Sequence, residues 1–75
     1  MRNDVDGAES AYRGAIEADP KFADAHNNLG VLLEQESNDV TGAEGAYRDA
    51  IAADPKFAEA SNNLKYLLNN IRHFD

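Results

Sequence analysis

Asparagine pairs are the side chains of this 75-residue sequence whose type and spacing best suit binding chemistry. They recur in two related phrases, AHNNLG at residues 25–30 and ASNNLK at residues 60–65. Because an amide side chain both donates and accepts hydrogen bonds, it can pair with a peptide main chain whatever the peptide's own sequence. The alternative is structural, since most side-chain hydrogen bonds are local and an asparagine can bond a neighbouring helix.

The other reactive residues do not support catalysis or metal binding. His26 and His73 are not spaced as i and i+4 and have no repeated carboxylate partner, which favours a packing or surface role. The serines lack a glycine elbow or an evident base. The segment NDVDGAE fails as a calcium loop because arginine falls where the first and twelfth ligands belong. The sequence therefore predicts a protein that is not an enzyme and has no metal or cofactor.

Composition limits the class of protein and of partner. Fourteen acidic against seven basic residues give a net charge of −7, which disfavours nucleic acid and anionic membrane surfaces. Cysteine is absent, so disulfides and thiolate metal sites are excluded. The N-terminal residues MRNDVDGAES lack the apolar core of a signal peptide, and no stretch approaches the ~20 apolar residues of a membrane span. A cytoplasmic location is the default expectation.

An internal repeat organises the chain. Residues 3–33 align without a gap on residues 38–68, and only eight of the 31 aligned positions differ. In each copy the apolar residues recur at helical spacing, and Pro20 and Pro55 then interrupt the pattern. The sequence predicts an all-α fold of four helices near residues 4–18, 22–36, 39–53 and 57–73.

Capping signals and small residues refine this expectation. Asp39 or Thr41 can cap the third helix, the latter with Glu44 in a capping box. Asp6 with Glu9 is the weaker counterpart at the first helix. Glycine and alanine on the facing stripes allow close approach, and the recurring Tyr12 and Tyr47 are expected in the core.

These residues resemble the tetratricopeptide repeat. Its signature positions are occupied in order by Leu29, Gly30, Leu33, Ala43, Tyr47 and Pro55, and in the flanking partial units by Ala8, Tyr12, Pro20, Leu64 and Leu68. Three departures stand out: His26 and Ser61 replace a large aromatic, the period is 35 where the family has 34, and Lys65 replaces glycine. The resemblance implies a short antiparallel helical array, an α-solenoid. It also implies a single domain over residues 1–75, with a half unit at 3–22, a full unit at 23–57 and a terminal half unit at 58–75.

The resemblance also implies a protein-interaction module that holds a peptide or partner helix in a concave groove. The groove residues carried over from the family are Asp24, Asn27, Asn28, Val31, Glu34, Gln35, Glu59, Asn62, Asn63, Tyr66, Asn69 and Asn70. AHNNLG is further similar to the repeats of O-linked N-acetylglucosamine transferase, where an asparagine ladder contacts peptide backbone, which selects Asn28 and Asn63. The family's carboxylate clamp lacks its cations here, and the groove acids favour a neutral or basic partner.

Self-association is the alternative function. The first and last predicted helices each carry an apolar stripe that no neighbouring helix of the array covers, and such a stripe can bind a second copy. The stripes comprise Tyr12, Ile16, Leu64, Leu67, Leu68, Ile71 and Phe74. A homodimer, a scaffold element without a separate ligand, and a designed or excised fragment of a longer array all fit this pattern. We also expect Gly30 to lie under tight packing, whereas Lys65 covers the end of the array.

Overall fold

The computed structural model describes residues 4–72, with the backbone alone described at 71 and 72. Its helices are α1 (Val5–Ala18), α2 (Ala23–Gln35), α3 (Val40–Ala53) and α4 (Ala58–Arg72). This confirms the all-α prediction, with each boundary within one residue of the predicted one. No strand occurs among the described residues. None of the helices within this span is long and apolar enough to cross a membrane.

Aspartates cap two of the helices. Asp39 accepts a hydrogen bond from the Gly42 amide at 2.9 Å, so of the two predicted caps of α3 the aspartate is used. The first helix is capped by Asp4, not by Asp6, because the Asp4 carboxylate lies 2.9 Å from the Gly7 amide. Each carboxylate satisfies a backbone donor that the first turn of a helix leaves without an intrahelical partner.

The predicted capping boxes do not form. Glu44 instead pairs with Arg48 one turn along α3, at 2.9 Å, and Glu9 pairs with Arg13 in the same way on α1. A carboxylate one turn before an arginine meets it on the helix surface, and this i, i+4 contact competes with the backward reach that a capping box requires.

The turns after α1 and α3 have the same construction. Asp19 and Asp54 adopt extended backbone angles, as residues before proline do. The carboxylates of these aspartates accept hydrogen bonds from the backbone amides of Lys21 and Lys56 two residues later, at 3.2 and 3.0 Å. An aspartate side chain that bonds its own backbone in this way stabilises a turn. The Asp-Pro-Lys sequence therefore ends one helix and forms the turn that reverses the chain before the next.

The turn between α2 and α3 contains Asn38, the one non-glycine residue with positive φ (54°) among those described. Asparagine tolerates this left-handed conformation better than most residues. The following amide of Asp39 donates to the Leu33 carbonyl at 2.8 Å and closes the end of α2. Asn38 and Asp39 thus form a defined turn between α2 and α3.

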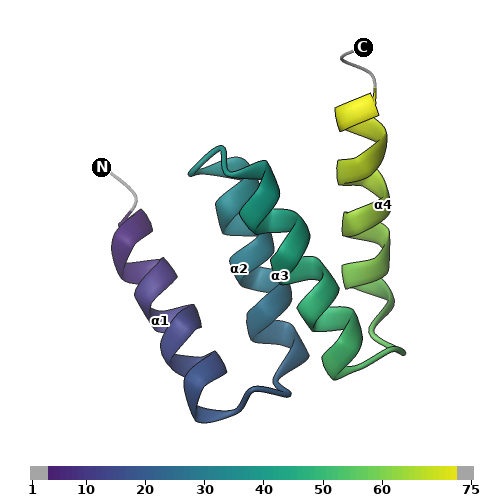
Figure 1. Cartoon of the computed structure of the whole chain (residues 1–75). Helices are drawn as coiled ribbons and strands as arrows, with labels where there is room; N and C mark the ends of the chain where they lie inside the picture. The colour runs from purple at the N-terminus through teal and green to yellow at the C-terminus, as the bar shows by residue number, and fades with distance from the viewer. Residues whose placement is uncertain (1–3, 73–75) are drawn as a thin grey trace.

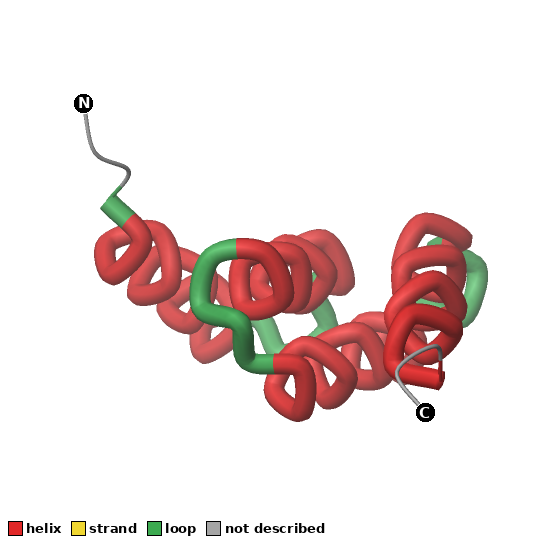
Figure 2. Tube along the Cα trace, turned by 90° about the horizontal axis from the view of Figure 1, so that it is seen from above, coloured by secondary structure: helices red, strands yellow, loops and turns green. Residues whose placement is uncertain are grey.

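The helices form a flat antiparallel array with α1 and α4 at opposite ends, as Figure 1 and Figure 2 both show. α2 packs against α1 and α3, α3 packs against α4, and α2 also meets α4. The array measures 38 × 35 × 17 Å, and its thinnest dimension is less than two helix diameters of ~10 Å. Each helix therefore keeps a large exposed face, which is where a partner could bind.

The core lies mainly between α2 and α3. It comprises Leu29, Leu33, Ala43, Ala46, Tyr47 and Leu67, with Tyr12, Ile16, Val31 and Leu64 packed against it. Tyr47 is 1% exposed, whereas Tyr12 is half-buried because α1 contacts only α2. A Cβ atom built on Gly30 would lie 2.5 Å from the Tyr47 ring. This confirms the expected tight packing at Gly30 and shows that its nearest neighbour is the ring of Tyr47.

Candidate binding surface

The residues predicted to line the groove come from α2 and α4, which meet in the array. The structure leaves most of them exposed, namely Asp24, Asn28, Gln35, Glu59, Asn62, Tyr66, Asn69 and Asn70. Val31, Glu34 and Asn63 are half-buried, and Asn27 is buried at 1% exposure. The helix faces thus present polar side chains to solvent around a few partly buried ones. Their contact with a ligand stays a prediction.

Asn27 joins the two helices. The side-chain oxygen Oδ1 of Asn27 accepts a hydrogen bond from Nδ2 of Asn63 at 3.0 Å, and Nδ2 of Asn27 donates to the Glu59 carboxylate at 3.4 Å. Because Asn27 is buried, a ligand has little access to it. Asn27 therefore differs from the other eleven residues of the predicted groove: the structure gives it a positioning role for Asn63 and Glu59. The structural alternative for the asparagines holds at this position.

Glu34 is hydrogen-bonded to a core residue. It accepts a hydrogen bond of 2.8 Å from the Tyr47 hydroxyl. Burial of the phenol, together with the hydrogen bond to Glu34 and its negative charge, raises the pKa of Tyr47 well above its ordinary value. The tyrosine consequently remains a neutral donor at physiological pH. The contact connects a half-buried carboxylate of α2 to Tyr47, the largest fully buried side chain of α3.

His26 has a packing role. It is 8% exposed, and its Nε2 atom lies 2.8 Å from the carbonyl oxygen of Pro20. This hydrogen bond connects the first turn of α2 with the loop that follows α1. It supports the structural reading of the histidine, in the position where the family usually has a large aromatic. Among the described residues, no three histidine, cysteine or acidic side chains gather as a metal site would require.

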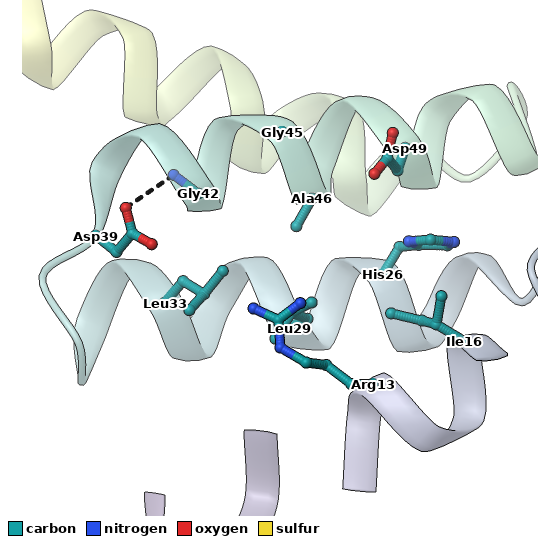
Figure 3. Close-up of a pocket in the computed structure, with 10 residues that line it drawn as sticks. All are labelled: Arg13, Ile16, His26, Leu29, Leu33, Asp39, Gly42, Gly45, Ala46 and Asp49. Carbon is teal, nitrogen blue, oxygen red and sulfur yellow. Dashed lines mark hydrogen bonds between the residues drawn. The ribbon is translucent and has the colours of Figure 1, made fainter. Parts of the chain in front are cut away.

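The sequence did not predict a pocket that residues of α1, α2 and α3 line, and Figure 3 shows α2 in the middle of the view with α3 above it and α1 below. The pocket has a volume of about 280 Å³. Arg13 borders it on α1, Asp49 borders it on α3, and Leu29 and Leu33 form part of its floor. The signal in the sequence is the helical spacing of the small residues Gly42, Gly45 and Ala46 that line the pocket. A Cβ atom at Gly45 would meet nothing within 4 Å, whereas the space beside Gly42 holds the Asp39 carboxylate. α1 and α3 do not pack against each other, which is why a pocket remains.

The residues predicted for self-association differ in how free they are. Leu67 is 3% exposed and packs in the chain's own core, so it is not available to a second copy. Tyr12, Ile16, Leu64 and Leu68 are half-buried and keep part of their surface exposed. The side chain of Ile71 and the whole of Phe74 lie outside the described residues.

Comparison with known proteins agrees with the helical array. No significant match to a curated protein was found. The sequence matches the family Tetratricopeptide repeat over residues 2–58, a segment that contains α1, α2, α3 and the first residue of α4. Repeats of this family generally mediate protein–protein interaction, and its domains are typically non-catalytic. The chain belongs to the tetratricopeptide repeat family.

Proposed function

We propose that the chain binds an extended peptide segment of a protein partner across α2 and α4, through the side-chain amides of Asn28 and Asn63. The observation that carries this proposal is the hydrogen bond of 3.0 Å between the Asn63 amide and buried Asn27. It fixes the orientation of Asn63 before any ligand arrives. An amide that is already ordered loses less side-chain entropy when it binds.

The hydrogen-bonding capacity that remains suits a peptide main chain. Asn63 donates through its Nδ2 atom to Asn27, and no donor among the described residues pairs with its Oδ1 atom. That oxygen can accept from a peptide N–H. Asn28 is exposed and offers both a donor and an acceptor. The similarity of AHNNLG to the repeats of O-linked N-acetylglucosamine transferase supports the same two asparagines.

Charge favours a neutral or basic peptide. Asp24 and Glu59 are exposed on the same two helices as the asparagines, and the chain carries a net charge of −7. Glu59 is also held near the amide of Asn27. An acidic peptide would meet repulsion from these carboxylates, whereas a lysine or arginine could pair with them. The preference should weaken as salt screens the exposed charges.

The test is an NMR titration with unstructured peptides of matched length and neutral, positive or negative net charge. We expect the side-chain amide signals of Asn28 and Asn63 to shift with the neutral and positive peptides. Asn28→Ala with Asn63→Ala should weaken binding roughly tenfold or more, because each lost hydrogen bond is worth ~1 kcal/mol.

A matched control changes two exposed, uncharged polar side chains on the other helices. Ser10→Ala with Thr41→Ala alters α1 and α3 without changing the net charge. This control should bind the same peptides as the parent chain. An equal loss of affinity in the control, or peptide-induced shifts confined to α1 and α3, would remove the proposed surface.

A further inference from the structure

The outer faces of α1 and α4 correspond to a contact that the chain already makes internally. The repeat offset relates α1 to α3 and α4 to α2, and α2 packs against α3 as the largest helix contact of the array. The α4 helix of one copy and the α1 helix of a second copy therefore carry the two halves of the same contact. Since α1 and α4 lie at opposite ends (Figure 1), such pairing would stack copies head to tail.

The α1 half of this contact is complete. The buried face of α3 consists of Ala43, Ala46, Tyr47 and Ala50. The residues one repeat earlier have the same types, and they are Ala8, Ala11, Tyr12 and Ala15. The positions of α3 at which α1 differs are Thr41, Gly45, Asp49 and Ala52, and all are exposed. Nothing on the packing face of α1 has changed.

The α4 half keeps the apolar side chains and the polar partner. Leu64 and Leu68 of α4 are equivalent in the repeat to Leu29 and Leu33 of α2. Asn69 is equivalent in the repeat to Glu34. Its side-chain oxygen can accept a hydrogen bond from a tyrosine hydroxyl, as the Glu34 carboxylate accepts one from Tyr47.

Two further differences between α2 and α4 lie at the positions of His26 and Val31. Ser61 is smaller than its counterpart His26. Val31 is half-buried against the core cluster, and its counterpart Tyr66 is 70% exposed in the single chain. The difference that adds bulk against the tyrosine is that between Gly30 and Lys65.

We propose that Lys65 stops the chain from stacking head to tail on a second copy. A Cβ atom at Gly30 would lie 2.5 Å from Cε1 and 2.6 Å from Cδ1 of Tyr47, closer than Cβ atoms approach other side chains. At the equivalent junction between copies, the Cβ atom of Lys65 would meet the ring of Tyr12 at that spacing. The ring occupies the space between two helices, so it can yield only by separating them.

This role differs from solubilising an end of the array by charge. A charge acts through hydration and leaves the fit of the two faces unchanged, whereas a Cβ atom prevents the helices from approaching. The distinction can be measured, because alanine removes the charge and keeps the Cβ atom, and glycine removes both. The self-association predicted from the sequence would then have to use another geometry than this junction.

The experiment compares oligomeric mass by light scattering after size exclusion, from micromolar to millimolar protein. Each variant also carries Gly14→Ala, because Gly14 is exposed with open space at its Cβ position and alanine offsets the helix propensity lost at residue 65. Far-UV circular dichroism checks that each variant is folded. We expect the parent and Lys65→Ala to keep the monomer mass of 8.2 kDa. Lys65→Gly should show a mass that rises with concentration to more than twice that value, because the stack does not close.

Ala11→Lys supplies the matched block on the other face. Ala11 is exposed in the chain, but its counterpart Ala46 is buried against α2, so a lysine there should leave the monomer intact and prevent stacking. Combined with Lys65→Gly, it should restore the monomer mass. The proposal is overturned if folded Lys65→Gly remains monomeric, if Lys65→Ala associates as strongly, or if the parent chain already associates and Ala11→Lys abolishes that association.

Discussion

Replacing Gly30 with alanine is the most direct perturbation of the packing between α2 and α3. The added Cβ atom would lie 2.5 Å from Cε1, 2.6 Å from Cδ1 and 3.1 Å from Cζ of Tyr47. An ordinary contact requires the ring to move by about 1 Å, but Tyr47 is 1% exposed and its hydroxyl is bonded to Glu34. We therefore expect the ring and its hydrogen bond both to be disturbed.

The magnitude follows from three contributions. Overpacking in a filled core costs ~1–3 kcal/mol. Disturbing the bond between Tyr47 and Glu34 adds ~1 kcal/mol. The replacement of a helical glycine by alanine returns ~1 kcal/mol of helix propensity. The net expectation for Gly30→Ala is a loss of ~1–3 kcal/mol in the free energy of unfolding, and a chain of this size loses ~4–8 °C in Tm per kcal/mol.

Gly14→Ala and Gly45→Ala are matched controls. Both glycines lie within helices, and a Cβ atom at either position meets nothing within 4 Å. Each control should gain up to ~1 kcal/mol from helix propensity alone. Urea and thermal unfolding followed by circular dichroism would measure all three variants. If Gly30→Ala were as stable as Gly45→Ala, the ring of Tyr47 would not occupy the contact described, and the basis of the Lys65 stop would fail with it.

Four other substitutions test the polar contacts. The pKa of Tyr47 is raised in the folded chain from the ordinary tyrosine value of about 10. Above pH ~10 the unfolded chain therefore loses the phenol proton more readily than the folded chain does. Stability should therefore fall as pH rises above 10, and Tyr47→Phe should lose this dependence while costing ~1 kcal/mol at neutral pH, both measured by unfolding at pH ~8 and ~11. Asp39→Ala should lower the free energy of unfolding by ~1 kcal/mol, and Thr41→Ala should lower it by a few tenths at most. An equal loss for the two variants would indicate that Thr41 caps α3 in a capping box. Asn27→Ala should cost ~1–3 kcal/mol by urea unfolding and broaden the Asn63 amide signal, and a sharp, unshifted signal would contradict the positioning role.

The sequence predicts the fold closely because its local signals agree with one another. The helical spacing, the Asp-Pro turns and the repeat indicate the same four helices, and no strong preference opposes them. The caps are less predictable, because Asp4, Asp6, Asp39 and Thr41 are all capable of capping. The position at which the chain leaves the helix decides between them, and helix ends can be located from sequence only to within a few residues.

The binding surface is less predictable than the fold, because helical periodicity gives the direction of a side chain but not its partner. Asn27 and Asn28 are adjacent and of one type, yet one is buried and the other exposed. Asn27 is buried because α4 brings Asn63 and Glu59 against it, from 36 and 32 residues away. A pattern of neighbouring residues in the sequence cannot predict a contact between residues this far apart. The repeat could have suggested it, since the Asn27 counterpart Asn62 has no helix beyond it in the described residues and is exposed. An asparagine between two helices thus positions its neighbours, and the same residue on the last described helix remains available to a partner.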